Sequence, residues 1–344
     1  MTLFMDIESS TRLGLWYEPA EVAQIKNAFI CTAIELVHAF DGHVHRIQGD
    51  AVMAFFGGAK VKSEDAVVDA LNAASTLWLF VKSTVIPMLK AEGYDEDFGI
   101  RVGIDYAPDA HWRSFGYPGV DEFSATAFQV DAAAKLQSAA GRNQIMLGQT
   151  LVEHLDIPDV ITDTKTVFRD GDHQQEVYLL PNHTLPNGSR HNYRQVLLRA
   201  EEYLRCSPLA EAATSYTGDP NLQPIQLKMT VHQEEDGPAL DEYASSSLVL
   251  PKGRHIRFAV SLPFRPRLPY TVTFEVENHG KQAHALAGDS YDNHTTVREI
   301  KSTRQHDNIV HWEHTAYRGL HYMTIVVKDC SKTLARRRVG VFIE

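Results

Sequence analysis

The sequence lacks the segments that would carry it into or across a membrane. None of its apolar runs approaches the roughly 20 residues that a helix needs to span a bilayer. The N-terminal residues contain no basic stretch followed by an apolar stretch, so they do not form a secretory signal peptide. We therefore expect a cytoplasmic protein that has no membrane partner.

Cysteine is scarce as well. The three cysteines, Cys31, Cys206 and Cys330, are odd in number and lie far apart in the chain. They argue against a disulfide framework and against a zinc site built from paired cysteines. This usage is typical of a reducing compartment.

Positive charge is in short supply. The chain has 33 Lys and Arg against 44 Asp and Glu, which gives a formal net charge of -11. An acidic excess argues against general nucleic-acid binding, which depends on clustered Lys and Arg. A single polyphosphate ligand is compatible with it, because bound divalent cations can supply the positive charge.

The chain is long enough for two domains, since 344 residues exceed one ordinary hydrophobic core. Residues 1–181 alternate strand and helix patterns and predict an α+β layered domain. Residues 182–220 predict a linker rich in Pro, Gly and Asn, followed by connecting helices over 193–216. Residues 221–344 contain strands separated by turn residues and predict an all-β sandwich.

Within the first domain, apolar residues at helical spacing predict helices, and short or alternating apolar runs predict strands. Pro87 is expected to bend the second helix. The expected helices are 19–40, 63–93 and 124–140, and the expected strands are 2–7, 43–48, 51–56, 98–107, 143–148 and 175–180.

Two aspartates occupy unusual positions in this pattern. Asp6 ends the first apolar strand, and Asp50 follows Gly49 at the tip of the expected hairpin. Gly49 allows a tight turn, and the chain after Asp6 turns into a helix whose backbone N–H groups face an anion. Each aspartate alone is most simply a solvated strand end. Together, two convergent carboxylates beside an anion site are what a two-metal phosphoryl-transfer centre needs, with Mg²⁺ or Mn²⁺ as the favoured ions.

Several segments then carry a family resemblance. The chain resembles the class III nucleotidyl cyclase domain, in order and spacing, at LFMDIESST (3–11), GHVHRIQGDAVMAFFG (42–57), IRVGIDYA (100–107) and FQVDAAAKLQ (128–137). Its C-terminal part resembles the β-rich sensor domain attached to cyclases in bacterial anti-phage operons, at 270–289 and 311–329. The combination is similar to the pyrimidine cyclases of Pycsar defence systems, which convert UTP or CTP into the 3′,5′-cyclic monophosphate.

The resemblance implies a ferredoxin-like catalytic domain that acts as a phosphorus–oxygen lyase. Asp6, Asp50 and the backbone carbonyl of Ile7 match the ligands of two Mg²⁺ or Mn²⁺ ions per active site. Asp131 and Lys135 match the residues that hold the ribose and the transition-state phosphate, where purine cyclases carry Asn and Arg. In this family the aspartate pair and the Lys135 helix of one chain face opposite sites, so the resemblance implies a symmetric homodimer.

Three further positions match the pocket that reads the base: Phe4, Arg46 and Ser124. Arg46 offers only hydrogen-bond donors, which suit the O4 acceptor of uracil better than the amino group of cytosine. The expected reaction therefore converts UTP into cyclic UMP, a second messenger in antiviral defence, and CTP or ATP is the alternative substrate. Phe4 also fits simple core packing, and Arg46 also fits a solvated residue or the partner of a nearby acid. The aromatic-rich stretch 108–124 is expected to shape this pocket.

The departures from the purine pattern leave a rival interpretation open. Asp131 and Lys135 also fit an ordinary i,i+4 ion pair, and the chain could be a nucleotide-binding sensor that has lost catalysis. If Asp6 and Asp50 are metal ligands with no packing role, replacing either by Ala should abolish turnover and leave the fold intact.

The C-terminal domain is expected to bind an unidentified cue. Its stretch HWEHTAYRGLH contains His311, His314 and His321. No Cys completes a metal site there, and we expect polar residues on the surface of the sandwich.

Overall fold

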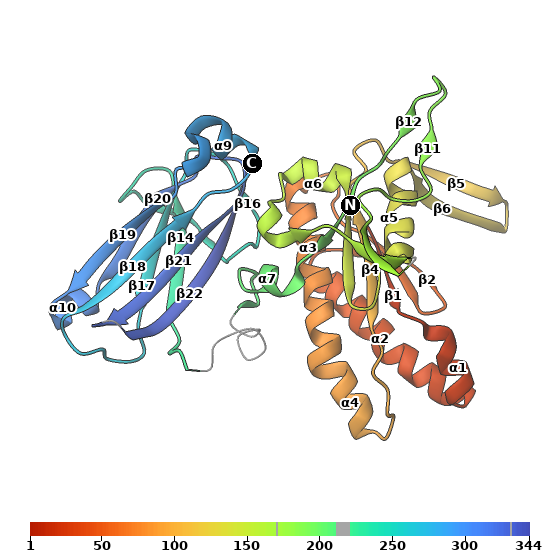
Figure 1. Cartoon of the computed structure of the whole chain (residues 1–344), viewed down its shortest axis with the longest axis horizontal. Helices are drawn as coiled ribbons and strands as arrows, with labels where there is room; N and C mark the ends of the chain where they lie inside the picture. Colours follow the sequence, from red (N-terminus) through yellow and green to blue (C-terminus); the bar gives the residue numbers. More distant parts are fainter. Residues whose placement is uncertain (170, 211–220, 331) are drawn as a thin grey trace. The chain divides into compact units, whose positions relative to one another are not determined.

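The computed structural model describes residues 1–169, 171–210, 221–330 and 332–344, which fold into two compact units (Figure 1). The first unit comprises Met1–His154 and Asp159–Ala200, and the second comprises Leu155–Pro158 and Glu201–Glu344. No helix among these residues is long and apolar enough to cross a membrane.

The first unit is built on a seven-stranded sheet in the order β2-β3-β1-β4-β7-β13-β8. Strand β1 pairs antiparallel with both of its neighbours, whereas β4 and β7 run parallel. The strands are β1 (Thr2–Ile7), β2 (His43–Gln48), β3 (Ala51–Phe55), β4 (Ile100–Asp105), β7 (Gln144–Gly148), β8 (Thr162–Asp163) and β13 (Gln195–Leu198). The predicted α+β fold is confirmed, and β1 lies inside the sheet between β3 of the hairpin β2–β3 and β4.

The main helices form where apolar residues recur at helical spacing. Helix α2 buries one stripe of side chains, whereas α3 is buried almost throughout its second half. The predicted bend before Pro87 takes the form of a π-helical turn at Val81–Val85, which joins α3 to α4. The helices of this unit are α1 (Leu13–Trp16), α2 (Pro19–Ala39), α3 (Ser63–Phe80), α4 (Ile86–Ala91), α5 (Phe128–Ala139) and α6 (Gln149–Leu155), with 3-10 turns at Ser10–Arg12 and Asp159–Ile161. Helix α7 (Ala200–Leu204) starts at the last residue of this unit and continues in the second unit.

The predicted helix 124–140 is wrong at its start. Residues Val120–Thr126 form strand β6, which pairs with β5 (His111–Tyr117), and helix α5 begins at Phe128. The alanines of this stretch favour a helix by propensity, but pairing with the aromatic strand β5 decides the outcome. The two strands form a hairpin that extends away from the seven-stranded sheet (Figure 1).

The predicted linker and connecting helices are also wrong in part. Residues Gln195–Leu198 form strand β13 of the seven-stranded sheet, because Gln195 and Leu198 are buried between β7 and β8. The linker forms a small hairpin of β11 (His183–Thr184) and β12 (Arg190–His191), and Tyr178 makes only an isolated bridge to Arg194 in the predicted strand 175–180. A further hairpin joins β9 (Thr166–Arg169) and β10 (Asp172–Gln175). Residues 211–216 of the predicted connecting helices (193–216) lie outside the described residues.

The second unit contains the predicted sheets. One has the order β15-β14-β17-β20 and the other β16-β22-β21-β18-β19, and one buried core combines side chains from both, including Phe258 and Phe274. The elements are β14 (Gln226–His232), β15 (Ala239–Tyr243), β16 (Val249–Leu250), β17 (His255–Ser261), β18 (Tyr270–Glu277), α9 (Lys281–Ala287), a 3-10 turn (Gly288–Ser290), β19 (His294–Ile300), α10 (Thr303–His306), β20 (Ile309–His314), β21 (Gly319–Asp329) and β22 (Lys332–Ile343).

Candidate active site

The two predicted metal-binding carboxylates lie side by side at one end of β1. Asp50 sits in the β2–β3 turn, where Gly49 has a φ of 66° that only glycine adopts freely. The Asp50 carboxylate accepts hydrogen bonds from the backbone N–H of Ile7 (3.1 Å) and the hydroxyl of Ser10 (2.8 Å). Ile7 follows Asp6 directly, so the turn is tied to the end of the strand that carries the other carboxylate.

These contacts correct one expectation. Asp50 was expected to have no packing role, yet its carboxylate also accepts a hydrogen bond from Lys26 on α2 at 3.3 Å. An Asp50→Ala variant would leave the Ile7 N–H and the Ser10 hydroxyl without their partner. Asp50→Asn is therefore the variant that separates a role in chemistry from a role in the fold.

Asp6 is held by an arginine from the neighbouring strand. Arg101 on β4 is directly opposite Asp6 in the register and binds it with both ends of its guanidinium, at 3.0 Å from Nε and 2.5 Å from Nη2. Burial raises the pKa of the Asp6 carboxyl; the hydrogen bond from Arg101 opposes that rise, and the charge of Asp50 adds to it.

Arg101, Lys26 and Ser10 are site residues that the sequence analysis missed. Ser10 lies in the ESST turn, which was noted only for its backbone N–H groups. Arg101 could have been found from the register, since the strand IRVGID places an arginine opposite Asp6. Lys26 gives no such signal, because a lysine on the polar face of a helix is normally solvated.

The donor set fits magnesium or manganese. Carboxylate oxygens are hard ligands, and Mg²⁺ is commonly held by one or two carboxylates together with substrate phosphates. Among the described residues no group of three or more His, Cys, Asp or Glu could hold a metal by itself. The pair Asp6 and Asp50 therefore fits ions that arrive with a polyphosphate, and does not fit a site made entirely of protein side chains.

The predicted base-reading arginine has an acidic partner. Strand β2 carries an irregularity in its pairing with β3 between Val44 and Arg46, and such a bulge re-aims the side chains around it. Arg46 forms an ion pair with Glu122 on β6, and the His45 ring nitrogen lies 3.1 Å from the same carboxylate. The alternative that Arg46 pairs with a nearby acid is thus what the structure shows.

Aromatic rings of the stretch 108–124 surround this pair. Trp112 on β5 packs against His45, Phe55 and Phe123, with ring centroids 5.8, 4.9 and 5.5 Å away. Trp112 is 40% exposed, so it still offers a flat surface to solvent.

The other two base-pocket positions are packed side chains. Phe4 is partly buried against Met53, Ala125 and Val130, so simple core packing describes its contacts. Ser124 is buried on β6, opposite Arg113 of β5.

Asp131 and Lys135 lie on helix α5 but do not form the i,i+4 ion pair. The Lys135 amine is 2.9 Å from the His183 ring instead, and Asp131 is exposed. The side chain of Gln137, on the same helix, lies beside Asp6. A helix turns by about 100° per residue, so Lys135 points to nearly the opposite side from Gln137. The structure therefore does not bring Lys135 to the aspartate pair of its own chain.

Close packing fixes the position of α5 on the sheet. Gly103 of β4 has no side chain, and a Cβ atom there would lie 2.2 Å from the backbone nitrogen of Gln137 and 2.3 Å from the Ala133 carbonyl oxygen. Strand β4 thus carries Arg101 on the site side and supports, through Gly103, the helix that bears Asp131 and Lys135.

This fold and site coincide with a known family. A model of the adenylate and guanylate cyclase catalytic domain matches residues 1–182, and a model of the adenylyl/guanylyl and SMODS C-terminal sensor domain matches residues 208–344. The chain belongs to the class III nucleotide cyclase family and carries that C-terminal sensor domain. The resemblance stated from the sequence is confirmed.

The proteins that are similar to this chain are named as cyclases of pyrimidine nucleotides. Two cytidylate cyclases of Escherichia coli are 38% and 33% identical over 100% of this chain, and the chain covers 74% and 79% of them. A uridylate cyclase of Micromonospora echinofusca is 28% identical over 46% of this chain and 51% of its own length. The relatives support a pyrimidine cyclase, and the cytidylate alternative fits them better than the expected uridylate activity.

Proposed function

We propose that this protein is a cytidylate cyclase that converts CTP into 3′,5′-cyclic CMP and pyrophosphate. The observation that carries the proposal is the similarity to cytidylate cyclases along the whole chain, because similarity to a uridylate cyclase is confined to less than half of it. The pairing of a cyclase with a sensor domain further supports a role as a signal-producing enzyme of antiviral defence.

The chemistry around Arg46 supports cytosine over uracil. Arg46 by itself offers only hydrogen-bond donors, but its partner Glu122 adds a carboxylate that can accept hydrogen bonds from the base. Cytosine presents an amino donor at position 4 next to the N3 acceptor, so it can pair with both groups at once. Uracil presents the reversed pattern, an acceptor at O4 next to an N3–H donor, so the preference for cytosine requires that Glu122 faces position 4 of the base and Arg46 faces N3.

The reaction needs charge neutralisation more than covalent chemistry. Two Mg²⁺ or Mn²⁺ ions held by Asp6, Asp50 and the Ile7 carbonyl would lower the pKa of the ribose 3′-hydroxyl and offset the phosphate charge. Arg101, once its carboxylate partner binds a cation, is free to bind phosphate oxygens. The 3′-oxygen forms its bond to the α-phosphorus as the bond to the β-phosphate oxygen breaks, and pyrophosphate leaves.

A homodimer completes this site. Lys135 points away from the aspartate pair of its own chain, so it serves a site only if a second copy supplies the aspartates. The hairpin β5–β6 offers a surface for such a copy, because Phe115, Tyr117 and Val120 are 49, 67 and 64% exposed. Lys135 would contact the phosphates, and Asp131 the ribose.

Product identification tests the proposal. Purified protein is incubated with ATP, GTP, CTP or UTP and Mn²⁺, and the products are identified by mass spectrometry. We expect cyclic CMP as the main product of the wild type and no product from Asp50→Asn. Cyclic UMP as the main product would overturn the cytidylate assignment, and nucleotide binding without any pyrophosphate release would favour the inactive sensor.

The same assay tests the role of Glu122. A Glu122→Gln substitution keeps the size of the side chain but supplies an amide N–H that suits uracil. We expect the ratio of CTP to UTP turnover to fall by about tenfold, since one charged hydrogen bond is exchanged for a neutral one. An unchanged ratio would remove Glu122 from base recognition.

A further inference from the structure

The second unit contains a pocket that the cyclase reaction does not use. It is a hollow of about 510 Å³ that opens to solvent between the two sheets. Its walls include Phe258 of β17, Met323 of β21 and Val341 of β22, and its polar groups include Asp292, which precedes β19, and Glu313 of β20. Apolar walls with a few polar groups are typical of a small-molecule site.

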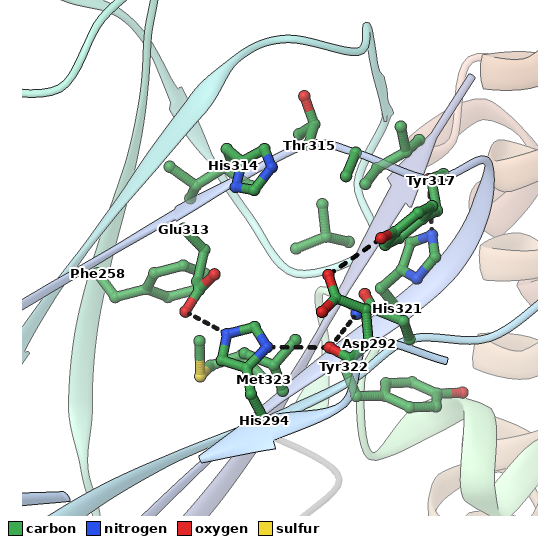
Figure 2. Close-up of a pocket in the computed structure, with 16 residues that line it drawn as sticks. Phe258, Asp292, His294, Glu313, His314, Thr315, Tyr317, His321, Tyr322 and Met323 are labelled. Atoms are coloured by element: carbon green, nitrogen blue, oxygen red, sulfur yellow. Dashed lines mark hydrogen bonds and ion pairs between the residues drawn. The ribbon is translucent and has the colours of Figure 1, made fainter. Parts of the chain in front are cut away.

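A hydrogen-bonded bridge joins the edges of the two sheets beside this pocket. Figure 2 shows the His294 ring on β19 bonded to the Glu313 carboxylate on β20, at 3.1 Å between Nε2 and Oε1. The other ring nitrogen of His294 lies 3.0 Å from the backbone oxygen of Asp292. Both partners are acceptors, so His294 satisfies them only as an imidazolium. Burial lowers the pKa of His294, but these two acceptors outweigh it and the net shift is upward.

Glu313 is held from a second side. The His311 ring donates to the same carboxylate oxygen at 2.7 Å and is stacked on Phe274. His311 and His321 are buried, which corrects the prediction that these histidines lie on the sandwich surface. The second oxygen of Glu313 accepts no hydrogen bond from the part of the chain that the structure describes.

Two of the donors that line the pocket are already in use. The Tyr317 hydroxyl donates to Asp292 at 3.0 Å, and the Asn278 side-chain amide donates to the Asp292 carbonyl at 3.1 Å. The remaining oxygens of the Asp292 carboxylate and of the Asn278 amide have no donor among the described residues. The pocket therefore offers unused acceptors and few unused donors.

The net charge of the pocket is negative, which also favours a ligand that presents hydrogen-bond donors. Asp292 and Glu313 are carboxylates, the His294 imidazolium offsets one of these two charges, and no Lys or Arg is among the described residues that line the pocket. Burial lowers the pKa of His321 to about 4, so this side chain is neutral at pH 7. A phosphate or carboxylate group on a ligand would find no free cation here, whereas an N–H donor would find unpaired oxygens.

We propose that this pocket binds a small, flat organic molecule that presents amino or amidine N–H groups and carries no phosphate. The N–H groups meet the free oxygens of Glu313 and Asp292, and the flat body lies against Phe258 and Met323. This site is separate from the cyclase reaction, and its test does not depend on the nucleotide that the enzyme uses.

Two matched probes test the sign of the ligand charge. Benzamidine and benzoate have the same flat shape, but the first is a donor-bearing cation and the second is an acceptor anion. The full chain, with its methionine methyl groups labelled with ¹³C, is titrated with each probe and followed by NMR. Met323 lines the pocket and Met53 packs near the active site, so their two resonances, assigned through Met→Leu variants, report the two sites separately.

We expect millimolar benzamidine to shift the Met323 resonance in a saturable way and to leave Met53 unchanged, with no matching effect of benzoate. The Glu313→Gln variant should weaken benzamidine binding at least about tenfold. The control Glu299→Gln, at an exposed position of the other edge strand, β19, should bind like the wild type. A Met323 resonance that responds to benzoate as strongly, or that ignores benzamidine, would overturn the proposal, as would unchanged binding in Glu313→Gln.

Discussion

At the scale of single residues, Asp105 is a buried carboxyl group that the proposed reaction does not use. It ends strand β4 and accepts hydrogen bonds from the Tyr193 hydroxyl (2.6 Å), the Tyr106 N–H (2.9 Å) and the Leu151 N–H (3.3 Å). Burial raises its pKa to about 7, although these hydrogen bonds oppose the rise. Asp105 is therefore protonated in the folded protein at pH values where it is ionised in the unfolded chain.

This difference predicts how stability depends on pH. Between the unfolded value of 3.8 and the folded value of about 7, the folded state holds a proton that the unfolded state does not, so stability falls as pH rises. The Asp105→Asn variant cannot ionise and should lose less stability over this range. We expect its melting temperature, relative to the wild type, to increase by at least about 2 °C from pH 5 to pH 8 in thermal denaturation followed by circular dichroism.

The pKa is also raised for Asp6 and Asp69, but both residues are unchanged in the variant. The difference in melting temperature between the variant and the wild type therefore reports the contribution of Asp105 alone. The exposed Asp172 provides the matched control, and Asp172→Asn should shift the melting temperature equally at both pH values. A difference between Asp105→Asn and the wild type that does not change with pH would contradict the prediction.

At the scale of secondary-structure elements, the contact of α5 with β4 determines where Asp131 and Lys135 lie. A Gly103→Ala substitution places a Cβ atom 2.2 Å from the backbone of α5, so the helix must move away from the sheet. We expect a loss of about 1–3 kcal/mol in the free energy of unfolding, and lower cyclase activity because Lys135 moves with the helix. Urea denaturation and pyrophosphate release measure the two effects.

Gly58→Ala is the control for this change, since a Cβ atom at Gly58 would meet nothing within 4 Å. It should leave both stability and activity close to those of the wild type. If Gly103→Ala behaves in the same way, the helix is not fixed by this contact.

The elements differ in how well the sequence predicts them. Helix α2 and the hairpin β2–β3 were predicted because their apolar spacing and the Gly49–Asp50 turn are local signals. Strands β6 and β13 were missed because each depends on a distant partner, β5 in one case and β7 in the other. Tertiary pairing overrides helix propensity there.

The site shows the same division. Asp6 and Asp50 could be singled out from their places at a strand end and a turn. The ion pair of Arg46 with Glu122 could not, because the two residues meet only through the bulge in β2 and the hairpin β5–β6. The pocket beside Glu313 depends likewise on two edge strands, β19 and β20, that the sequence did not reveal.

At the scale of the whole molecule, the proposed homodimer predicts that two inactive variants rescue each other. Asp50→Asn removes a carboxylate, and Lys135→Ala removes the amine that the second copy is proposed to supply. Mixed dimers of the two variants contain one intact site and one doubly damaged site. When equal amounts are mixed and allowed to exchange subunits, we expect about a quarter of the wild-type activity, because half of the dimers are mixed and half of their sites are intact.

Light scattering during size-exclusion chromatography checks the dimer itself, and each variant alone provides the baseline. Activity that never rises above this baseline, in samples shown to exchange subunits, would mean that each chain builds its own site.

The two hydrogen bonds from Arg101 to Asp6 affect the order in which the proposed ligands bind. A lone cation must break this two-pronged contact and leave a guanidinium with nothing to hold. A cation that arrives on a triphosphate brings the guanidinium a replacement partner. If the proposed cations bind at Asp6, we therefore expect nucleotide and cation to enter together, and magnesium without nucleotide to bind weakly.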